Sequence, residues 1–222
     1  MLKRIASLVA LATVVVASPA FAQEKRVEAS VLVGWTFADG VSGQAFATPS
    51  GVFDRVDPKD SFKWGLGVGI MASEHAEVGF MFGQQMTTLQ AGGTSTVDIG
   101  DMSINTYHGY FGFNAGDHDS KVRPYAFIGV GATNYSGVDF TRINGQTGTI
   151  GAETQLSTTW GAGVKVFPSP SVGVRFGIQW TPTYIKSDAA GYWCDPYWGC
   201  YLAGDPQYSN QWDIGGGIVF RF

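Results

Sequence analysis

The chain has 222 residues, of which 14 are Lys or Arg and 18 are Asp or Glu, and only 14% are charged, whereas ordinary soluble domains carry about 25%. The formal net charge of −4 argues against a nucleic-acid partner, because such proteins need a basic face to neutralise phosphates. A content of 45% apolar and 14% aromatic residues argues against a disordered chain. Beyond the N-terminus no apolar run reaches the roughly 18 residues of a membrane-spanning helix, which excludes a polytopic helical membrane protein.

Residues 1–22 have the three parts of a secretory signal peptide. Lys3 and Arg4 supply positive charge, an apolar stretch follows, and residues 18–22 end in the small-x-small pattern that signal peptidase cleaves. The alternative is a transmembrane anchor, but the apolar stretch is too short for one. We therefore predict that residues 1–22 are removed and that residues 23–222 form one domain.

The rest of the sequence alternates with a period of two residues. In residues 27–37 Val, Ala, Trp and Phe at odd positions oppose mainly Glu, Ser, Gly and Thr at even positions, which is typical of a strand with one apolar face. The same pattern predicts eight strands, at residues 27–37, 61–71, 76–87, 99–114, 121–135, 155–167, 172–185 and 210–222.

The fourth predicted strand has an irregular phase. Met102 and Ile104 are at even positions, whereas Tyr107 and the following phenylalanines are at odd positions. An extra residue shifts the phase of a strand by one. We therefore predict a β-bulge near residues 105–107 that restores one apolar face.

The connections between strands alternate in length. The short ones are residues 72–75, 115–120 and 168–171, and the long ones, rich in Gly, Ser, Thr, Asp and Asn, are residues 38–60, 88–98, 136–154 and 186–209. The face opposite the aromatic residues is mostly glycine, which weakens a solvent-facing strand but saves space in a narrow interior. Strands of about ten residues, an even strand number and alternating connections are typical of bacterial outer-membrane barrels.

These features predict an all-β fold, an eight-stranded antiparallel up-and-down transmembrane β-barrel with short periplasmic turns and long extracellular loops. Closure is required because an open edge in hydrocarbon would leave backbone groups unpaired. Near the predicted strand ends lie aromatic residues suited to an interfacial girdle, namely Trp35, Phe37, Trp180, Tyr184 and Trp212.

Two segments resemble a known family. Residues 122–131, Val-Arg-Pro-Tyr-Ala-Phe-Ile-Gly-Val-Gly, resemble the recurrent fifth-strand motif of the small OmpA-like/OmpX-like outer-membrane β-barrel family. The chain end, with Ile218, Phe220 and Phe222 on one face, is similar to the C-terminal signal read by the outer-membrane assembly machinery. The resemblance implies a location in the outer membrane of a Gram-negative cell, with the lipid bilayer and that machinery as partners. The family includes adhesins, structural barrels and narrow pores, so the fold does not assign a function.

In this topology the charged residues of the glycine-rich face point into the lumen. They are Glu28, Glu77, Lys165, Arg175 and Arg221 in the periplasmic half, and Lys63 and Asp213 nearer the outer end. Because an unpaired buried charge is costly, we expect these residues to pair. Glu28 and Arg221 should pair with each other, because the first and last strands become neighbours on closure. The network is interpreted either as a polar core that fills the barrel or as a gated, narrow ion path.

The last long loop contains both cysteines. Cys194 and Cys200 in an exported chain predict a disulfide, and the rival metal site lacks a nearby histidine to complete a tetrahedral ligand set. The loop also displays aromatic residues, Tyr192, Trp193, Tyr197, Trp198 and Tyr201. They are a candidate recognition element for an unidentified extracellular ligand, or else a cap over the barrel mouth or part of the girdle.

No pattern predicts catalysis. His75 and His118 lie in or beside short turns, and His108 in the fourth strand has no His-x-Ser constellation or paired carboxylates beside it. An acidic segment, Asp54, Asp57 and Asp60, lacks the spacing of a Ca²⁺-binding loop. We predict a monomeric, non-enzymatic barrel without cofactor or metal, whose role is structural or surface-interactive, with a narrow porin-like channel for small solutes or ions as the alternative.

Overall fold

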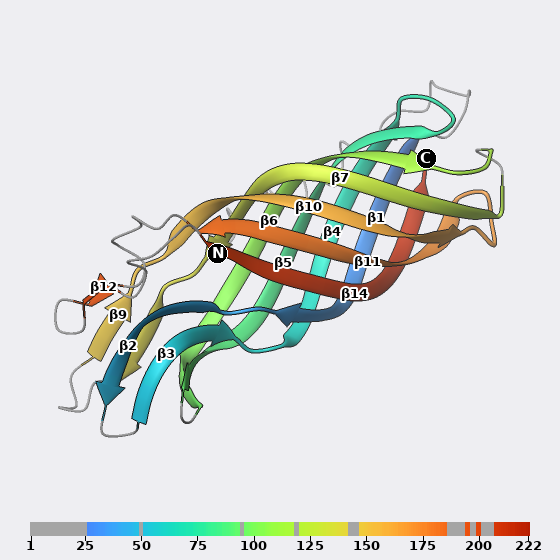
Figure 1. Cartoon of the computed structure of the whole chain (residues 1–222). Helices are drawn as coiled ribbons and strands as arrows, with labels where there is room; N and C mark the ends of the chain where they lie inside the picture. Colours follow the sequence, from blue (N-terminus) through green and yellow to red (C-terminus); the bar gives the residue numbers. More distant parts are fainter. Residues whose placement is uncertain are drawn as a thin grey trace, which may run out of the picture.

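The alternating segments of the sequence form strands that close into one barrel (Figure 1). The computed structural model describes residues 26–48, 51–93, 96–117, 120–141, 147–185, 194–195, 199–200 and 207–222. The barrel strands are β1 (Val27–Ala38), β4 (Ser61–Met71), β5 (Ala76–Gly93), β6 (Val97–Asn114), β7 (Val122–Tyr135), β10 (Glu153–Val166), β11 (Val172–Ile185) and β14 (Gln207–Arg221). Each pairs antiparallel with its two neighbours, and the pairing of β5 with β6 closes the ring, which confirms the predicted fold class. In the described part of the chain, no helix is long and apolar enough to cross a membrane.

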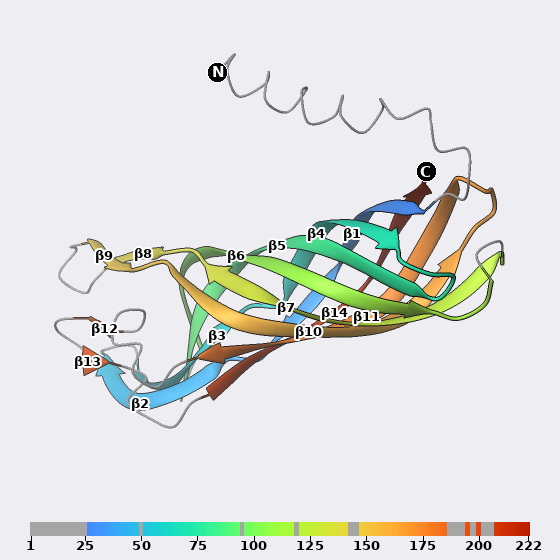
Figure 2. The same ribbon diagram turned by 90° about the horizontal axis from the view of Figure 1, so that it is seen from above.

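The two ends of the barrel differ. One end, here called the short-turn end, carries the C-terminus and the connections between β4 and β5, β6 and β7, and β10 and β11 (Figure 2). The other, the hairpin end, carries extra strands that the sequence analysis did not predict. These are β2 (Val41–Thr48), β3 (Gly51–Pro58), β8 (Val138–Thr141), β9 (Thr147–Ile150), β12 (Cys194–Asp195) and β13 (Gly199–Cys200). They escaped prediction because they are short and lack a sustained alternation of large apolar residues.

Strand register determines the width of the barrel. A path that starts at Phe37 of β1 and passes through directly paired residues of all eight strands returns to β1 at Val27. The register is therefore displaced along β1 from position 37 to position 27. A stagger of ten residues over eight strands tilts the strands by roughly 40° and leaves an interior that side chains can just fill. Inward glycines make that filling possible. A Cβ atom added at Gly177 would lie 2.5 Å from the Tyr125 hydroxyl, and one at Gly79 would lie 2.6 Å from that of Tyr110.

The outer face of the barrel is apolar and ends in an aromatic girdle. Phe37, Trp212, Trp180 and Trp160 are consecutive partners across β1, β14, β11 and β10. The Trp180 and Trp212 rings stack with their centroids 5.7 Å apart. Across β4, β5 and β6 the girdle continues through Trp64, Phe82 and Tyr107, whose neighbouring ring centroids lie 5.5 and 5.3 Å apart.

The prediction of a β-bulge near residues 105–107 is wrong. Strand β6 pairs with β5 without interruption from Phe113 to Gly100, and the register shift lies beyond Gly100, between Leu89 and Gln90 of β5. Met102 and Ile104 are only 5% and 1% exposed, because they point into the barrel. They belong to an apolar cluster at the hairpin end, formed by Val41, Val56, Leu89, Met102, Ile104, Tyr135, Val138 and Ile185. The apolar phase slips in the sequence because the lumen itself becomes apolar there.

Candidate functional site

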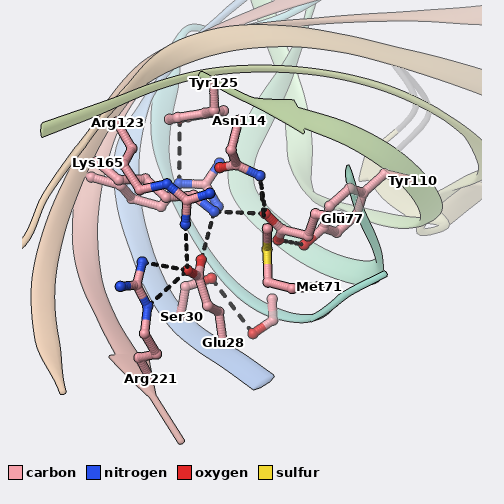
Figure 3. Close-up of polar contacts among 12 residues, drawn as sticks. Glu28, Ser30, Met71, Glu77, Tyr110, Asn114, Arg123, Tyr125, Lys165 and Arg221 are labelled. Carbon is pink, nitrogen blue, oxygen red and sulfur yellow. Dashed lines mark hydrogen bonds and ion pairs between the residues drawn. The ribbon is translucent and has the colours of Figure 1, made fainter. Parts of the chain in front are cut away.

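Five charged side chains form an ion cluster in the lumen at the short-turn end (Figure 3). They are Glu28, Glu77, Arg123, Lys165 and Arg221, each 4% exposed or less. The Lys165 ammonium lies 2.6 Å from Glu28 Oε2 and 2.7 Å from Glu77 Oε2. Arg221 Nη2 lies 2.9 Å from Glu28 Oε1, which is the pair expected from the closure of β1 on β14.

Hydrogen bonds and a ring contact add to the ion cluster. Glu77 accepts hydrogen bonds from the Tyr110 hydroxyl at 2.6 Å and from Asn114 Nδ2 at 3.0 Å. The Arg221 guanidinium also lies over the Phe167 ring, 3.7 Å from its centroid. Desolvating charges is costly, so such a cluster is tolerated only where geometry is good and the remaining polar atoms find partners.

Arg123 is a member of the cluster that the sequence analysis did not place in the lumen. Its Nη1 lies 3.9 Å from Glu28 Oε1, and its Nη2 donates a hydrogen bond to the Glu74 carbonyl at 2.8 Å. In the sequence, Arg123 stands out only as part of a family motif. The signal that could have placed it is alternation, because Arg123 shares the inward phase of Tyr125 and Phe127 on β7.

Three basic residues stand side by side on one wall of the lumen. Register pairs Arg123 of β7 with Lys165 of β10, and Lys165 with Arg175 of β11. Like charges directly opposite on neighbouring strands repel. Glu28 lies within ion-pair distance of Arg123 and Lys165, and Glu77 lies within ion-pair distance of Lys165. Arg175 instead packs on the ring of Tyr125. The Arg175 guanidinium lies 4.6 Å from the centroid of that ring, and its Nε donates a hydrogen bond to the hydroxyl at 3.3 Å.

A second ion pair and a cavity lie further toward the hairpin end. Lys63 Nζ is 2.6 Å from Asp213 Oδ2, and the Thr36 hydroxyl donates a hydrogen bond to Asp213 Oδ1 at 2.5 Å. Between this pair and the ion cluster is a cavity of about 80 Å³. Its polar lining comes from Lys63, Thr106, Tyr125, Arg175, Gln179 and Asp213.

His108 belongs to a layer of buried hydroxyl groups. Its Nε2 is 2.9 Å from the Ser157 hydroxyl, which accepts a hydrogen bond from Thr133 at 2.9 Å. This contact could not be predicted from the sequence, because the two residues are 49 positions apart on strands that do not pair with each other. His108 and Ser157 are 0% and 2% exposed, and no acidic residue in the described ranges hydrogen-bonds to the imidazole. The arrangement packs this level of the lumen with polar side chains.

The loop and terminal candidates lie apart from the lumen. Cys194 and Cys200 are direct backbone partners in the β12–β13 ladder. The aromatic loop candidates, Tyr192, Trp193, Tyr197, Trp198 and Tyr201, lie outside the described residues. At the chain end, Ile218, Phe220 and Phe222 are exposed on the lipid-facing side of β14 and just beyond it.

The acidic segment near the hairpin end has other partners. Asp57 forms an ion pair with Arg55 at 2.6 Å, and Asp60 accepts a hydrogen bond from the Ala38 amide at 3.1 Å. Within the described ranges, no group of three or more His, Cys, Asp or Glu residues is placed to hold a metal ion.

A family profile described as "Outer membrane protein beta-barrel domain" matches residues 8–222. Among solved structures, the outer membrane protein OprG from Pseudomonas aeruginosa is similar with a TM-score of 0.63 and 12% identity, over 88% of this chain and 95% of that one. Neisserial surface protein A gives 0.54 and 12%, over 90% and 98% of the two chains. AlkL in lipid bilayers gives 0.50 and 12%, over 92% and 95%. No curated protein sequence matches the chain.

Proposed function

The chain belongs to the outer membrane protein beta-barrel family, and from this we propose that it is a sealed barrel that acts at the cell surface through its extracellular hairpins. The observation that carries the proposal is the ion cluster. It joins charged side chains from β1, β5, β7, β10 and β14 across the lumen, each almost fully buried. A solute would have to separate charges that hold one another at less than 3 Å.

Conductance is the direct test of a sealed barrel. The refolded protein is inserted into planar bilayers, with a porin of known conductance as the positive control. We expect no reproducible current steps with or without reductant. Steps of constant size in many independent insertions would overturn the proposal.

A narrow channel is the second candidate, and the cavity lined by Arg175 and Lys63 favours it. In that case the ion cluster would have to rearrange to connect the cavity with the short-turn end. Replacing Arg175 by Ala would then change the size of the current steps. In a sealed barrel the same replacement affects stability alone.

For the hairpin end, we propose that Cys194 and Cys200 form a disulfide and that the surrounding aromatic residues bind a partner. The direct backbone pairing of the two cysteines supports a disulfide that holds a local shape. Binding of the refolded protein in nanodiscs to a printed glycan array tests the recognition role. Replacing Trp193 and Trp198 by Ala should abolish any binding that the unaltered protein shows.

A matched control replaces two exposed apolar residues elsewhere, Phe62 and Met86, by Ala. Heat-modifiable migration in gels reports whether each variant has folded. The aromatic loop would be ruled out as the binding element if the variant without Trp193 and Trp198 still bound the partner while the variant without Phe62 and Met86 did not.

Export and assembly complete the proposal. We propose that the barrel is a non-enzymatic monomer, that residues 1–22 are cleaved as a signal peptide, and that Phe222 is read by the outer-membrane assembly machinery. The exposed row of Ile218, Phe220 and Phe222 supports the last point. Mass spectrometry of the protein from outer membranes should give a chain that begins at Gln23. A chain that retains Met1 would contradict cleavage.

A further inference from the structure

We propose that the cavity in the middle of the barrel binds a small inorganic anion, of the size of chloride or bromide, with Arg175 as its main ligand. The first observation is the charge balance of the lumen. From the ion cluster to the second ion pair, the described lumen contains five basic side chains, Lys63, Arg123, Lys165, Arg175 and Arg221, and three acidic ones, Glu28, Glu77 and Asp213. Five against three leaves a formal excess of two positive charges.

Hydrogen bonding concentrates part of this excess on Arg175. Glu28 is shared by Lys165, Arg221 and, at longer range, Arg123, whereas Glu77 binds Lys165. In the described part of the chain, Arg175 contacts no carboxylate, and the partner of its Nε is the Tyr125 hydroxyl. The next cation along the wall is Lys165, so the neighbourhood adds repulsion.

The cavity has the size and the lining for an anion. At about 80 Å³ it has room for one halide ion together with a water molecule or two. Arg175 and Lys63 both line it, and Thr106 and Gln179 add polar groups. Asp213 is the one acidic group in the lining, and both of its oxygens are already engaged, by Lys63 and by Thr36. An anion there would take the place of the missing carboxylate beside Arg175.

The energetic reason is the cost of an uncompensated charge. Arg175 is partly buried, so its guanidinium loses part of its hydration, and a partner of opposite sign restores some of that free energy. The cation–π contact with Tyr125 compensates only in part, because the quadrupole of a ring attracts a cation more weakly than a full negative charge does. The inference does not depend on the proposed function, since a sealed barrel and a narrow pore could both hold the ion.

Urea unfolding in detergent micelles, followed by tryptophan fluorescence, tests the site. Chloride is exchanged for gluconate at constant ionic strength, because the six-carbon gluconate ion is too large for the cavity. An ion that binds only the folded state stabilises it by mass action. Above the dissociation constant, we expect the unfolding equilibrium constant to fall about tenfold for each tenfold rise in chloride.

Two variants assign the effect to the site. Arg175→Met removes the charge at similar length and should abolish the dependence on chloride. Arg55→Met removes a charge from the exposed Arg55–Asp57 pair on β3 and should leave the dependence intact. Equal stability of the unaltered protein in chloride and gluconate would overturn the proposal, and so would a chloride dependence that survives in Arg175→Met.

A crystallographic measurement needs no variant. Crystals of the unaltered protein grown in bromide should give an anomalous peak in the cavity, within reach of the Arg175 guanidinium. A cavity that contains only water at high bromide concentration would refute the site, even if Arg175→Met failed to fold.

Discussion

The short-turn half and the hairpin end of this barrel are built with opposite polarity. In the short-turn half the lumen contains the ion cluster, and the outer face carries exposed apolar residues such as Val33, Val68 and Ile128. At the hairpin end the lumen contains the apolar cluster around Leu89 and Ile104. The same strands β5, β6 and β7 pass through both regions, so the inversion occurs within single strands.

The outer face at the hairpin end carries pairs of polar side chains. Above the aromatic girdle, Gln84 Nε2 donates a hydrogen bond to Asn105 Oδ1 at 3.0 Å, and Asn134 Nδ2 donates one to Thr154 Oγ1 at 2.8 Å. Trp64 Nε1 donates to Gln84 Oε1 at 3.2 Å and so joins the girdle to this polar row. The comparison shows that the medium around each level, lipid or water, decides which face of a strand is apolar.

The largest expected effect comes from breaking the ion cluster. Lys165→Met leaves Glu28 and Glu77 without their shared cation, and removing one partner of a buried ion pair costs about 3–5 kcal/mol. Urea unfolding in micelles measures the loss. The control is Arg55→Met, which removes a pair at a side chain that is 48% exposed and should cost no more than about 1 kcal/mol. Equal losses in the two variants would mean that the buried ion cluster contributes no more to the free energy of unfolding than an exposed ion pair does.

The second comparison separates the apolar lumen from the lipid-facing surface. Leu89→Ala, at the hairpin end, should lower the free energy of unfolding by about 2–5 kcal/mol, because it opens a cavity in a packed core. Leu66→Ala, on the lipid-facing side of β4, should cost about 1–2 kcal/mol, because lipid chains fill the space and only the transfer term remains. The hairpin end would not be a packed core if Leu89→Ala proved the milder change.

The smallest expected effect concerns space inside the short-turn half. Gly177→Ala places a methyl group 2.5 Å from the Tyr125 hydroxyl and should cost about 1–3 kcal/mol, since the ring must shift. Gly109→Ala, whose nearest neighbour would be 3.9 Å away, should change the free energy of unfolding by less than about 0.5 kcal/mol. If Gly177→Ala were as mild as Gly109→Ala, the inner glycines would not be there to accommodate rings.

The architecture of the barrel follows from the amino-acid sequence alone. Alternation with a period of two residues is a local property, so the predicted bounds of β1, β4 and β11 agree with the structure to within one residue. Closure of a ring makes the first and last strands neighbours, and this was enough to bring Glu28 and Arg221 together. These results follow from pattern and topology without knowledge of any contact across the lumen.

Which side chains meet across the lumen is visible only in the folded barrel. Alternation tells which face a side chain is on, but contacts across the lumen depend on the stagger of all eight strands, which no single segment encodes. That is why three features were not predicted: the contact of His108 with Ser157, the place of Arg123 in the ion cluster, and the lack of a carboxylate contact for Arg175 among the described residues. The inward turn of Met102 and Ile104 was misread for a related reason. The apolar face of a strand points outward where lipid surrounds the barrel and inward beyond it. The depth at which a strand leaves the lipid is set by the whole barrel.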